Sequence, residues 1–329
     1  MNPIAIGLTA GDPNGIGPEI ALKAARRPQP ANRRLVLIGH RGIWERTARQ
    51  LGCPCPPDVP DLEAPLPRCS TWDPDMAPPP RPCPGKVRAD AARAAYANIL
   101  AAVAAAQNKR LAAIVTAPIS KEAFHLAGIR EPGHTELLAR LTGARRYAMM
   151  LFGEKLRVVL ATRHLPLRKV ADALTAEAIV EAVEMLARAL PWMGFKRARI
   201  GVCGLNPHAG DGGALGTEEQ TVIAPALARC RKRGWHVSGP IPADVIFHQH
   251  LAGKFDAVVA MYHDQGLGPM KMLSFETGVN LTLGLPILRT SPDHGTAFDL
   301  AGRNRANPAS MCAALDWAAR LAARKNPWA

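Results

Sequence analysis

Three histidines, each a few residues past a segment typical of a β-strand, are the first candidates for chemistry in this chain. They are His164, His208 and His263, which follow residues 156–162, 198–205 and 256–261. Loops at the carboxyl ends of neighbouring parallel strands meet at one edge of a sheet. Three neutral imidazoles there can hold a divalent cation and leave positions open for a substrate. Their long separations form no compact metal motif, so three solvated or capping histidines remain the alternative.

Two aspartates are candidates for supporting such a centre. Asp264 follows His263 directly, and Asp244 stands at the start of a helical pattern over residues 243–252. A carboxylate that accepts a hydrogen bond from an imidazole fixes its tautomer. The same two side chains, or a water molecule on a bound metal, are the candidates for the group that takes a proton from a substrate.

Basic and polar residues beside apolar segments predict where an anionic substrate would bind. Lys271, Asn280 and Arg289 border such segments, where lysine and arginine often clamp anions. Taken singly, such a residue is more often part of the solvated surface. His134 and Thr135 precede an apolar helical run, so Thr135 either caps that helix or contacts a phosphate or carboxylate together with His134.

Two glycine-rich loops join elements of the chain. The first, GDPNGIGPE at 11–19, lacks the spacing of a dinucleotide-binding fingerprint and is better explained as a tight turn before a helix. The second, at 206–216, contains His208 and precedes Thr217 and Gln220, a pair typical of a helix capping box. Its backbone N–H groups either face an anion or only position the histidine.

Strand-like apolar runs alternate with helical patterns along the chain. The expected strands are residues 4–9, 35–39, 111–116, 148–152, 156–162, 198–205, 256–261 and 279–283. The expected helices begin at Pro18 and after Pro118, and cover 87–107, 175–190, 217–233, 243–252 and 308–324. Residues 53–85 are rich in proline and predict an irregular surface excursion. The alternation predicts an α/β protein with a largely parallel sheet.

Composition excludes several classes of protein. The 329 residues are 48% hydrophobic and 21% charged, which excludes wholesale disorder and suits one large or two medium domains. No run of about 18 apolar residues predicts a membrane span, and the amino terminus has no signal-peptide pattern. The seven cysteines show no pairing pattern, so free thiols in the cytoplasm are expected.

Positive charge is in excess, with 41 lysines and arginines against 27 acidic residues and a formal net charge of +14. That balance would suit a nucleic-acid-binding protein, but the arginines are scattered and no nucleic-acid motif is present. A small anionic ligand is therefore the expected partner, with neither nucleic acid nor membrane. A basic RNA-binding module, or a non-catalytic protein that binds a phosphorylated metabolite, is the alternative.

Eight motifs occur in order along nearly the whole chain, with residues 40–90 contributing none. They are GDPNGIGPE (11–19), TAPISKE (116–122), GHTELLA (133–139), ATRHLPL (161–167), GLNPHAGDGG (204–213), GPIPAD (239–244), MYHDQGL (261–267) and GVNLTLGLPILRTSPDHGTA (278–297). Together they resemble the 4-hydroxythreonine-4-phosphate dehydrogenase family of vitamin B6 biosynthesis. The resemblance implies an isocitrate/isopropylmalate dehydrogenase-like α/β fold, with two α/β/α subdomains around a central cleft. It implies a cofactor-side subdomain of residues 1–130 with 282–329, and a metal, substrate and dimerisation subdomain of residues 131–281.

The same resemblance implies a homodimer with the active site at the subunit interface. It assigns one divalent metal, zinc, magnesium or cobalt, to His164, His208 and His263, the last supplied by the second subunit. It assigns substrate contacts to His134, Thr135, Lys271, Asn280 and Arg289.

A cofactor loop is implied by a second resemblance. HGTAFDLAG at 294–302, continuing to the ANP that ends at Pro308, is similar to the adenosine-binding loop of isocitrate and isopropylmalate dehydrogenases. The implied contacts are His294, Gly295, Thr296, Ala297, Asp299 and Asn307. In that pattern an acidic residue at Asp299 favours NAD, because its carboxylate can accept from a ribose hydroxyl; NADP is the alternative.

The implied reaction is the oxidation of 4-phosphooxy-L-threonine by NAD, with a divalent metal as Lewis acid. Its product, 2-amino-3-oxo-4-phosphooxybutanoate, is a β-keto acid that loses CO₂ to give 3-amino-2-oxopropyl phosphate. Relatives that oxidise 4-phospho-threonate, 4-phospho-erythronate or a cyclic dihydrodiol carboxylate are the alternatives, because GHTELLA is shared with sugar-acid enzymes.

Overall fold

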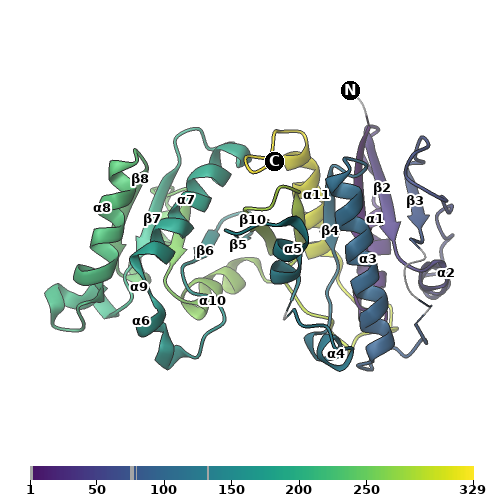
Figure 1. Ribbon diagram of the computed structural model, residues 1–329, viewed down its shortest axis with the longest axis horizontal. Helices are drawn as coiled ribbons and strands as arrows, with labels where there is room; N and C mark the ends of the chain where they lie inside the picture. The colour runs from purple at the N-terminus through teal and green to yellow at the C-terminus, as the bar shows by residue number, and fades with distance from the viewer. Residues whose placement is uncertain (1–2, 75–77, 79, 132) are drawn as a thin grey trace. The chain divides into compact units, whose positions relative to one another are not determined.

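The computed structural model describes residues 3–74, 78, 80–131 and 133–329, and its chain divides into two units (Figure 1). Unit 1 is residues 1–145 with 285–329, and unit 2 is residues 146–284. The expected boundaries lay at 130/131 and 281/282. The first boundary falls later because helix α5 (His134–Thr142) packs against α3 (Ala89–Gln107). His134 and Thr135 therefore belong to unit 1, whereas the subdomains implied by the resemblance placed them with the metal ligands.

Unit 1 is built on a parallel sheet in the order β3-β2-β1-β4-β11. Its strands are β1 (Ile4–Thr9), β2 (Arg33–Ile38), β3 (Cys69–Trp72), β4 (Ala113–Thr116) and β11 (Arg289–Pro292). The inner strands end in runs of buried residues, as expected for a parallel sheet covered on both faces.

Two of these strands differ from the sequence prediction. Strand β3 lies inside the proline-rich stretch that was expected to be irregular, and it pairs with Leu35–Ile38 of β2. That part of the prediction is wrong, because a four-residue edge strand leaves too little local pattern in the sequence to be recognised. Residues 75–77 and 79 of the stretch lie outside the described residues. Strand β11 was not expected, since its residues RTSP are polar although all four are buried.

The helices of unit 1 form two groups. They are α1 (Gly17–Ala25), α2 (Arg41–Gln50), α3, α4 (Lys121–Leu126), α5 and α11 (Ala309–Ala322). Helices α1 and α11 pack on each other and on β1. Helix α3 lies across β1 and β4 and packs against α4 and α5 (Figure 1). Pro18 stands in the first turn of α1, as its fixed φ predicts.

Unit 2 is built on a mixed sheet in the order β10-β5-β6-β9-β7-β8. Its strands are β5 (Ala148–Phe152), β6 (Arg157–Leu160), β7 (Arg199–Cys203), β8 (His236–Ile241), β9 (Ala257–Ala260) and β10 (Val279–Leu283). The pairs β10/β5 and β5/β6 are antiparallel, and the remaining pairs are parallel. The edge strand β8 was not expected, because HVSGPI is broken by glycine and proline and its pairing with β7 shifts register.

The helical segments of unit 2 include one irregular region. They are η1 (Leu167–Lys169), α6 (Val170–Ala173), α7 (Ala176–Met193), η2 (Pro207–Gly213), η3 (Glu219–Ile223), α8 (Ala224–Lys232), α9 (Ala243–Leu251) and α10 (His263–Ser274). The helix expected over 217–233 begins as the π-helical turn η3. The predicted capping box is wrong, because the Gln220 side chain donates to the Gly212 carbonyl at 2.8 Å instead of reaching back to Thr217.

Both units have the strand–helix composition of an α/β protein, so the fold class predicted from the sequence is confirmed. None of the described helices has the length and apolar character that crossing a bilayer requires.

Candidate active site

Two of the three candidate metal ligands lie side by side in unit 2. The ring centroids of His164 and His263 are 5.5 Å apart. Strands β6 and β9 pair in parallel, so the segments that leave their carboxyl ends start together. The Thr162 hydroxyl donates to the Met261 carbonyl at 2.7 Å and ties these two ends to each other. The pairing of the two strands therefore explains why the two imidazoles meet.

His263 is the first residue of helix α10, where the sequence suggested a loop. Its Nδ1 lies 2.7 Å from Oδ1 of Asp264, an exposed carboxylate. A carboxylate on Nδ1 orients an imidazole and directs its Nε2 outward as a ligand. Asp244 is an exposed residue in the first turn of α9. Within one chain, the His263 ring therefore stands with its Nδ1 against Asp264 and its centroid near that of His164.

The third histidine stands in an unusual backbone segment. His208 belongs to η2, where His208, Ala209 and Asp211 have φ of 53°, 53° and 42°. Residues other than glycine rarely occupy this left-handed region unless their surroundings fix it, and such positions cluster at functional sites.

Glu219 fixes the approach to this segment, and sequence reasoning did not single it out. Its Oε1 accepts the N–H groups of Leu205 and Asn206 at 2.7 and 2.8 Å, and its Oε2 accepts from the Asn206 side chain at 2.9 Å. Although burial opposes ionisation, the hydrogen bonds from Asn206 and Leu205 hold the pKa of Glu219 below its ordinary value. The only signal in the sequence is an acidic residue shortly after a glycine-rich loop.

Within the part of the chain that the structure describes, no three His, Cys, Asp or Glu side chains are grouped closely enough to hold a metal ion. The chemistry of the donors nevertheless suits a divalent ion. Two adjacent imidazoles, one with a carboxylate behind it, are typical ligands of zinc and cobalt.

Two of the candidate substrate-binding residues, buried Arg289 and half-buried His134, lie in unit 1. Arg289, the first residue of β11, is 2% exposed. Its Nε and Nη2 donate to the Thr116 hydroxyl at 2.9 and 2.7 Å, because β11 pairs with β4, which ends at Thr116. Burial lowers the pKa of Arg289 to about 9, while the charge of Glu136 opposes that shift.

His134 opens helix α5 beside this arginine. Burial, with a smaller contribution from the Arg289 charge, lowers the pKa of His134 well below its ordinary value, so the imidazole is neutral at pH 7. Its Nε2 is buried and has no hydrogen-bond partner among the described residues. Thr135 lies inside the first turn and Gly133 occupies the capping position, so the reading of Thr135 as a helix cap is wrong.

The remaining two candidates for substrate contact lie in unit 2. Asn280 is on β10, and its Oδ1 is buried without a hydrogen-bond partner in the described part of the chain. Lys271 is on α10, with Nζ 5.5 Å from the centre of the Phe275 ring.

The candidate cofactor loop packs on the glycine-rich loop of unit 1. The Ile16 N–H donates to the Thr296 carbonyl at 2.9 Å. A Cβ at Gly15 would stand 2.9 Å from the same carbonyl oxygen, so this close approach requires glycine. His294 and Ala297 are half-buried, and Gly295, Asp299 and Asn307 are exposed. The turn expected at 11–19 therefore supports the candidate cofactor loop.

Asp12 is a buried carboxylate that the sequence presented only as part of this turn. It is 1% exposed, its Oδ1 accepts the Asn14 N–H at 2.9 Å, and its Oδ2 is buried with no partner among the described residues. Burial raises the pKa of Asp12 to about 6, against the lowering effect of the Asn14 hydrogen bond.

We expect Asp12→Asn to stabilise the protein above pH 6. The folded pKa of Asp12 is raised from 3.8 to about 6, so folding favours its protonated form, and that favourable contribution is lost as pH rises through this window. Removing the charge should increase the free energy of unfolding at pH 7.5 by about 1–3 kcal/mol and have little effect near pH 4. Urea denaturation at both pH values measures the difference.

Asp256→Asn is the matched control for this prediction. Although burial acts in the opposite direction, hydrogen bonds from Arg199 hold the pKa of Asp256 below its ordinary value, so this substitution should destabilise at pH 7.5. Destabilisation of both variants to the same extent would contradict the account of Asp12.

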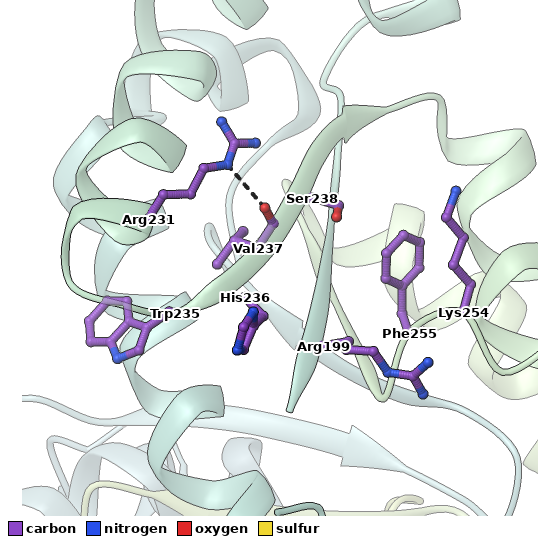
Figure 2. Close-up of a pocket in the computed structure, with 8 residues that line it drawn as sticks. All are labelled: Arg199, Arg231, Trp235, His236, Val237, Ser238, Lys254 and Phe255. Carbon is purple, nitrogen blue, oxygen red and sulfur yellow. Dashed lines mark hydrogen bonds between the residues drawn. The ribbon is translucent and has the colours of Figure 1, made fainter. Parts of the chain in front are cut away.

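A separate hollow in unit 2 is basic but carries no predicted site residue. It is lined by Arg199, Arg231, Trp235, His236, Val237, Ser238, Lys254 and Phe255 (Figure 2). Its arginines are engaged within the protein. Arg199 pairs with Asp256 at 2.9 Å. Arg231 donates to the Val237 carbonyl at 3.1 Å, the dashed line in Figure 2. The two arginines of this hollow therefore make contacts within the protein around the edge strand β8.

Comparison with known proteins shows which family this sequence and this fold resemble. Residues 31–318 match the family model of the pyridoxal phosphate biosynthetic protein PdxA. The chain is 42% identical to the 4-hydroxythreonine-4-phosphate dehydrogenase of Beijerinckia indica, over 97% of this chain and 95% of that one. It is 44% identical to the D-threonate 4-phosphate dehydrogenase of Cupriavidus necator, over 97% and 98%. The crystal structure of the 4-hydroxythreonine-4-phosphate dehydrogenase from Klebsiella pneumoniae superposes with a TM-score of 0.85 at 41% identity, covering 98% and 99%.

The chain shares its α/β fold with dehydrogenases and is more than 40% identical to them over nearly its whole length. It is therefore an oxidoreductase. It belongs to the PdxA family, because the family model covers most of its length. The family resemblance read from the sequence motifs is thereby confirmed.

Proposed function

We propose that the chain oxidises 4-phosphooxy-L-threonine with NAD, and that the product loses CO₂ to give 3-amino-2-oxopropyl phosphate. The observation that carries the proposal is the adjacency of the His164 and His263 imidazoles at the ends of two paired parallel strands. The buried, cationic Arg289 beside neutral His134 supports a phosphorylated substrate, because an anion bound there would offset the cost of burying the guanidinium.

His164, His208 and His263 are the residues that would hold a divalent metal ion. When bound, that ion would supply Lewis acidity that lowers the pKa of the substrate alcohol, and NAD would supply the hydride acceptor. Asp264 holds the His263 ring through Nδ1, and Glu219 holds the backbone that leads to His208. We also propose that the chain forms a homodimer with the active site at the subunit interface.

The substrate is held, in this proposal, through its anionic groups. Arg289 donates a planar set of N–H groups that suits phosphate or carboxylate oxygens, and Thr116 holds that set in place. His134 and Asn280 each bring a buried polar atom without a partner in the described chain, and Lys271 and Thr135 complete the contacts. Binding energy from these remote groups orients the carbinol carbon. Asp264 and Asp244 are the candidates for taking the alcohol proton.

The second candidate function is the oxidation of D-threonate 4-phosphate. The relative named D-threonate 4-phosphate dehydrogenase is as similar to this chain as the relative named 4-hydroxythreonine-4-phosphate dehydrogenase. A panel of 4-phosphooxy-L-threonine, D-threonate 4-phosphate and D-erythronate 4-phosphate, each with NAD and Co²⁺ or Mg²⁺, separates the two. The proposal predicts the highest kcat/KM for the phosphorylated amino acid. A higher kcat/KM for either sugar acid would make that sugar acid the substrate in place of 4-phosphooxy-L-threonine. Absence of NADH formation with all three compounds would reject the proposal.

We expect NAD to be preferred over NADP by at least about tenfold in kcat/KM, because the Asp299 carboxylate would face a ribose hydroxyl and repel a 2′-phosphate. Asp299→Asn should reduce that preference, mainly by improving the use of NADP. Asp61→Asn makes the same charge change at another exposed position of unit 1 and should leave the ratio unaltered. A wild-type preference for NADP would contradict the role of Asp299.

A further inference from the structure

The first helix of unit 1 holds the segment that precedes Asn307. Glu19 and Lys23, one turn apart on α1, form an ion pair with 2.7 Å between Oε1 and Nζ. Glu19 Oε1 also accepts the Ala306 N–H at 2.8 Å. Lys23 Nζ donates to the carbonyl oxygens of Ala306 and Asn304 at 2.9 and 3.3 Å. One ion pair thus binds both polar groups of one residue and the carbonyl of another.

These contacts are unlike those of an ordinary surface ion pair. Glu19 is 7% and Ala306 2% exposed, and only 21% of the Lys23 side chain is exposed. Exposed i,i+4 pairs add little to the stability of a helix, because water screens them. Here the pair faces an irregular segment in which Asn304 has a φ of 54°, a left-handed conformation that its surroundings must hold.

The same part of the molecule fixes the candidate cofactor loop at its other end. The Ile16 N–H, just before α1, donates to the Thr296 carbonyl at 2.9 Å. The start of α1 and its preceding turn therefore hold the loop near residue 296, and the Glu19–Lys23 pair holds it near residue 306. Asp299 lies between these two points, and Asn307 follows the second directly.

We infer that Glu19 and Lys23 are positioning residues for the cofactor, which hold the 304–306 segment so that the loop is ordered before the adenosine of NAD arrives. The inference rests on the proposed function, which places NAD at this loop. A loop that is already ordered does not have to lose conformational freedom when the ligand binds, so its affinity is higher.

The test is Lys23→Met in the full chain, with NADH binding measured by equilibrium fluorescence titration. We expect the Kd for NADH and the KM for NAD to rise about tenfold, because part of the binding free energy must then be used to order the loop. The kcat at saturating NAD and the KM for the phosphorylated substrate should not change. Lys23→Arg keeps a donor and the charge, and should restore most of the affinity.

Glu45→Gln is the matched control, because it breaks another i,i+4 ion pair, between Arg41 and Glu45 at 2.9 Å on the neighbouring helix α2. It should leave NADH binding unaltered. Equal NADH affinity of Lys23→Met and the wild type would overturn the inference and leave NAD as the cofactor. A lower kcat together with higher KM values for both NAD and substrate, and a lower melting temperature, would also overturn it, since that combination shows a general structural role. Failure of the wild type to bind NADH would reject the proposed function, and the inference with it.

Discussion

His208→Ala is expected to abolish turnover while leaving the fold intact. Loss of one of three imidazole ligands should remove the bound ion, whose Lewis acidity is worth several kcal/mol, so kcat should fall by at least about 10³-fold. The side chain is exposed, and its removal leaves no cavity. Metal content per chain, measured by mass spectrometry after gel filtration, should fall together with activity.

The control for this substitution is His248→Ala, which removes another exposed histidine of unit 2, on α9. It should leave both metal content and turnover unaltered. Normal activity of His208→Ala with its metal retained would contradict the assignment of His208 as a ligand.

Arg289→Met is expected to weaken the binding of the phosphorylated substrate without destabilising the protein. Losing a buried, charge-assisted contact should lower kcat/KM by about 10²–10³-fold, chiefly through KM. Because burial lowers the pKa of Arg289 to about 9, the guanidinium is costly to bury, and an apolar replacement should maintain or raise the free energy of unfolding. Steady-state kinetics and urea denaturation measure the two effects.

Arg157→Met is the matched control, because burial also lowers the pKa of this arginine, which donates to the Asp256 carbonyl in unit 2. Its substitution should leave the KM for substrate unaltered. An unchanged KM in Arg289→Met would show that the phosphate binds elsewhere.

The regular elements of the fold were predictable where local pattern and long-range packing agree. Strands β1, β5 and β10 have the residue bounds expected from their apolar runs. Strands β3, β8 and β11 were missed because their residues are short, polar or interrupted, and only pairing with a neighbour makes them strands. Their existence depends on contacts that no local window of sequence contains.

The sequence suggested candidate site residues one at a time, but it did not predict the contacts that hold them. Strand ends followed by histidines predicted the meeting of His164 and His263, which the structure brings together. The supporting roles of Thr116, Glu219 and Asp12 could not be predicted from the sequence, since each acts through a partner distant in sequence or through burial. Buried polar groups of this kind become visible only when the chain is folded.

The most direct test of the account is anomalous scattering at the cobalt absorption edge from crystals grown with Co²⁺. The account predicts one strong peak per chain, in contact with the imidazoles of His164, His208 and His263, with the last contributed by the same or a second copy. A cobalt ion bound away from these three rings in an enzyme that turns over would contradict it.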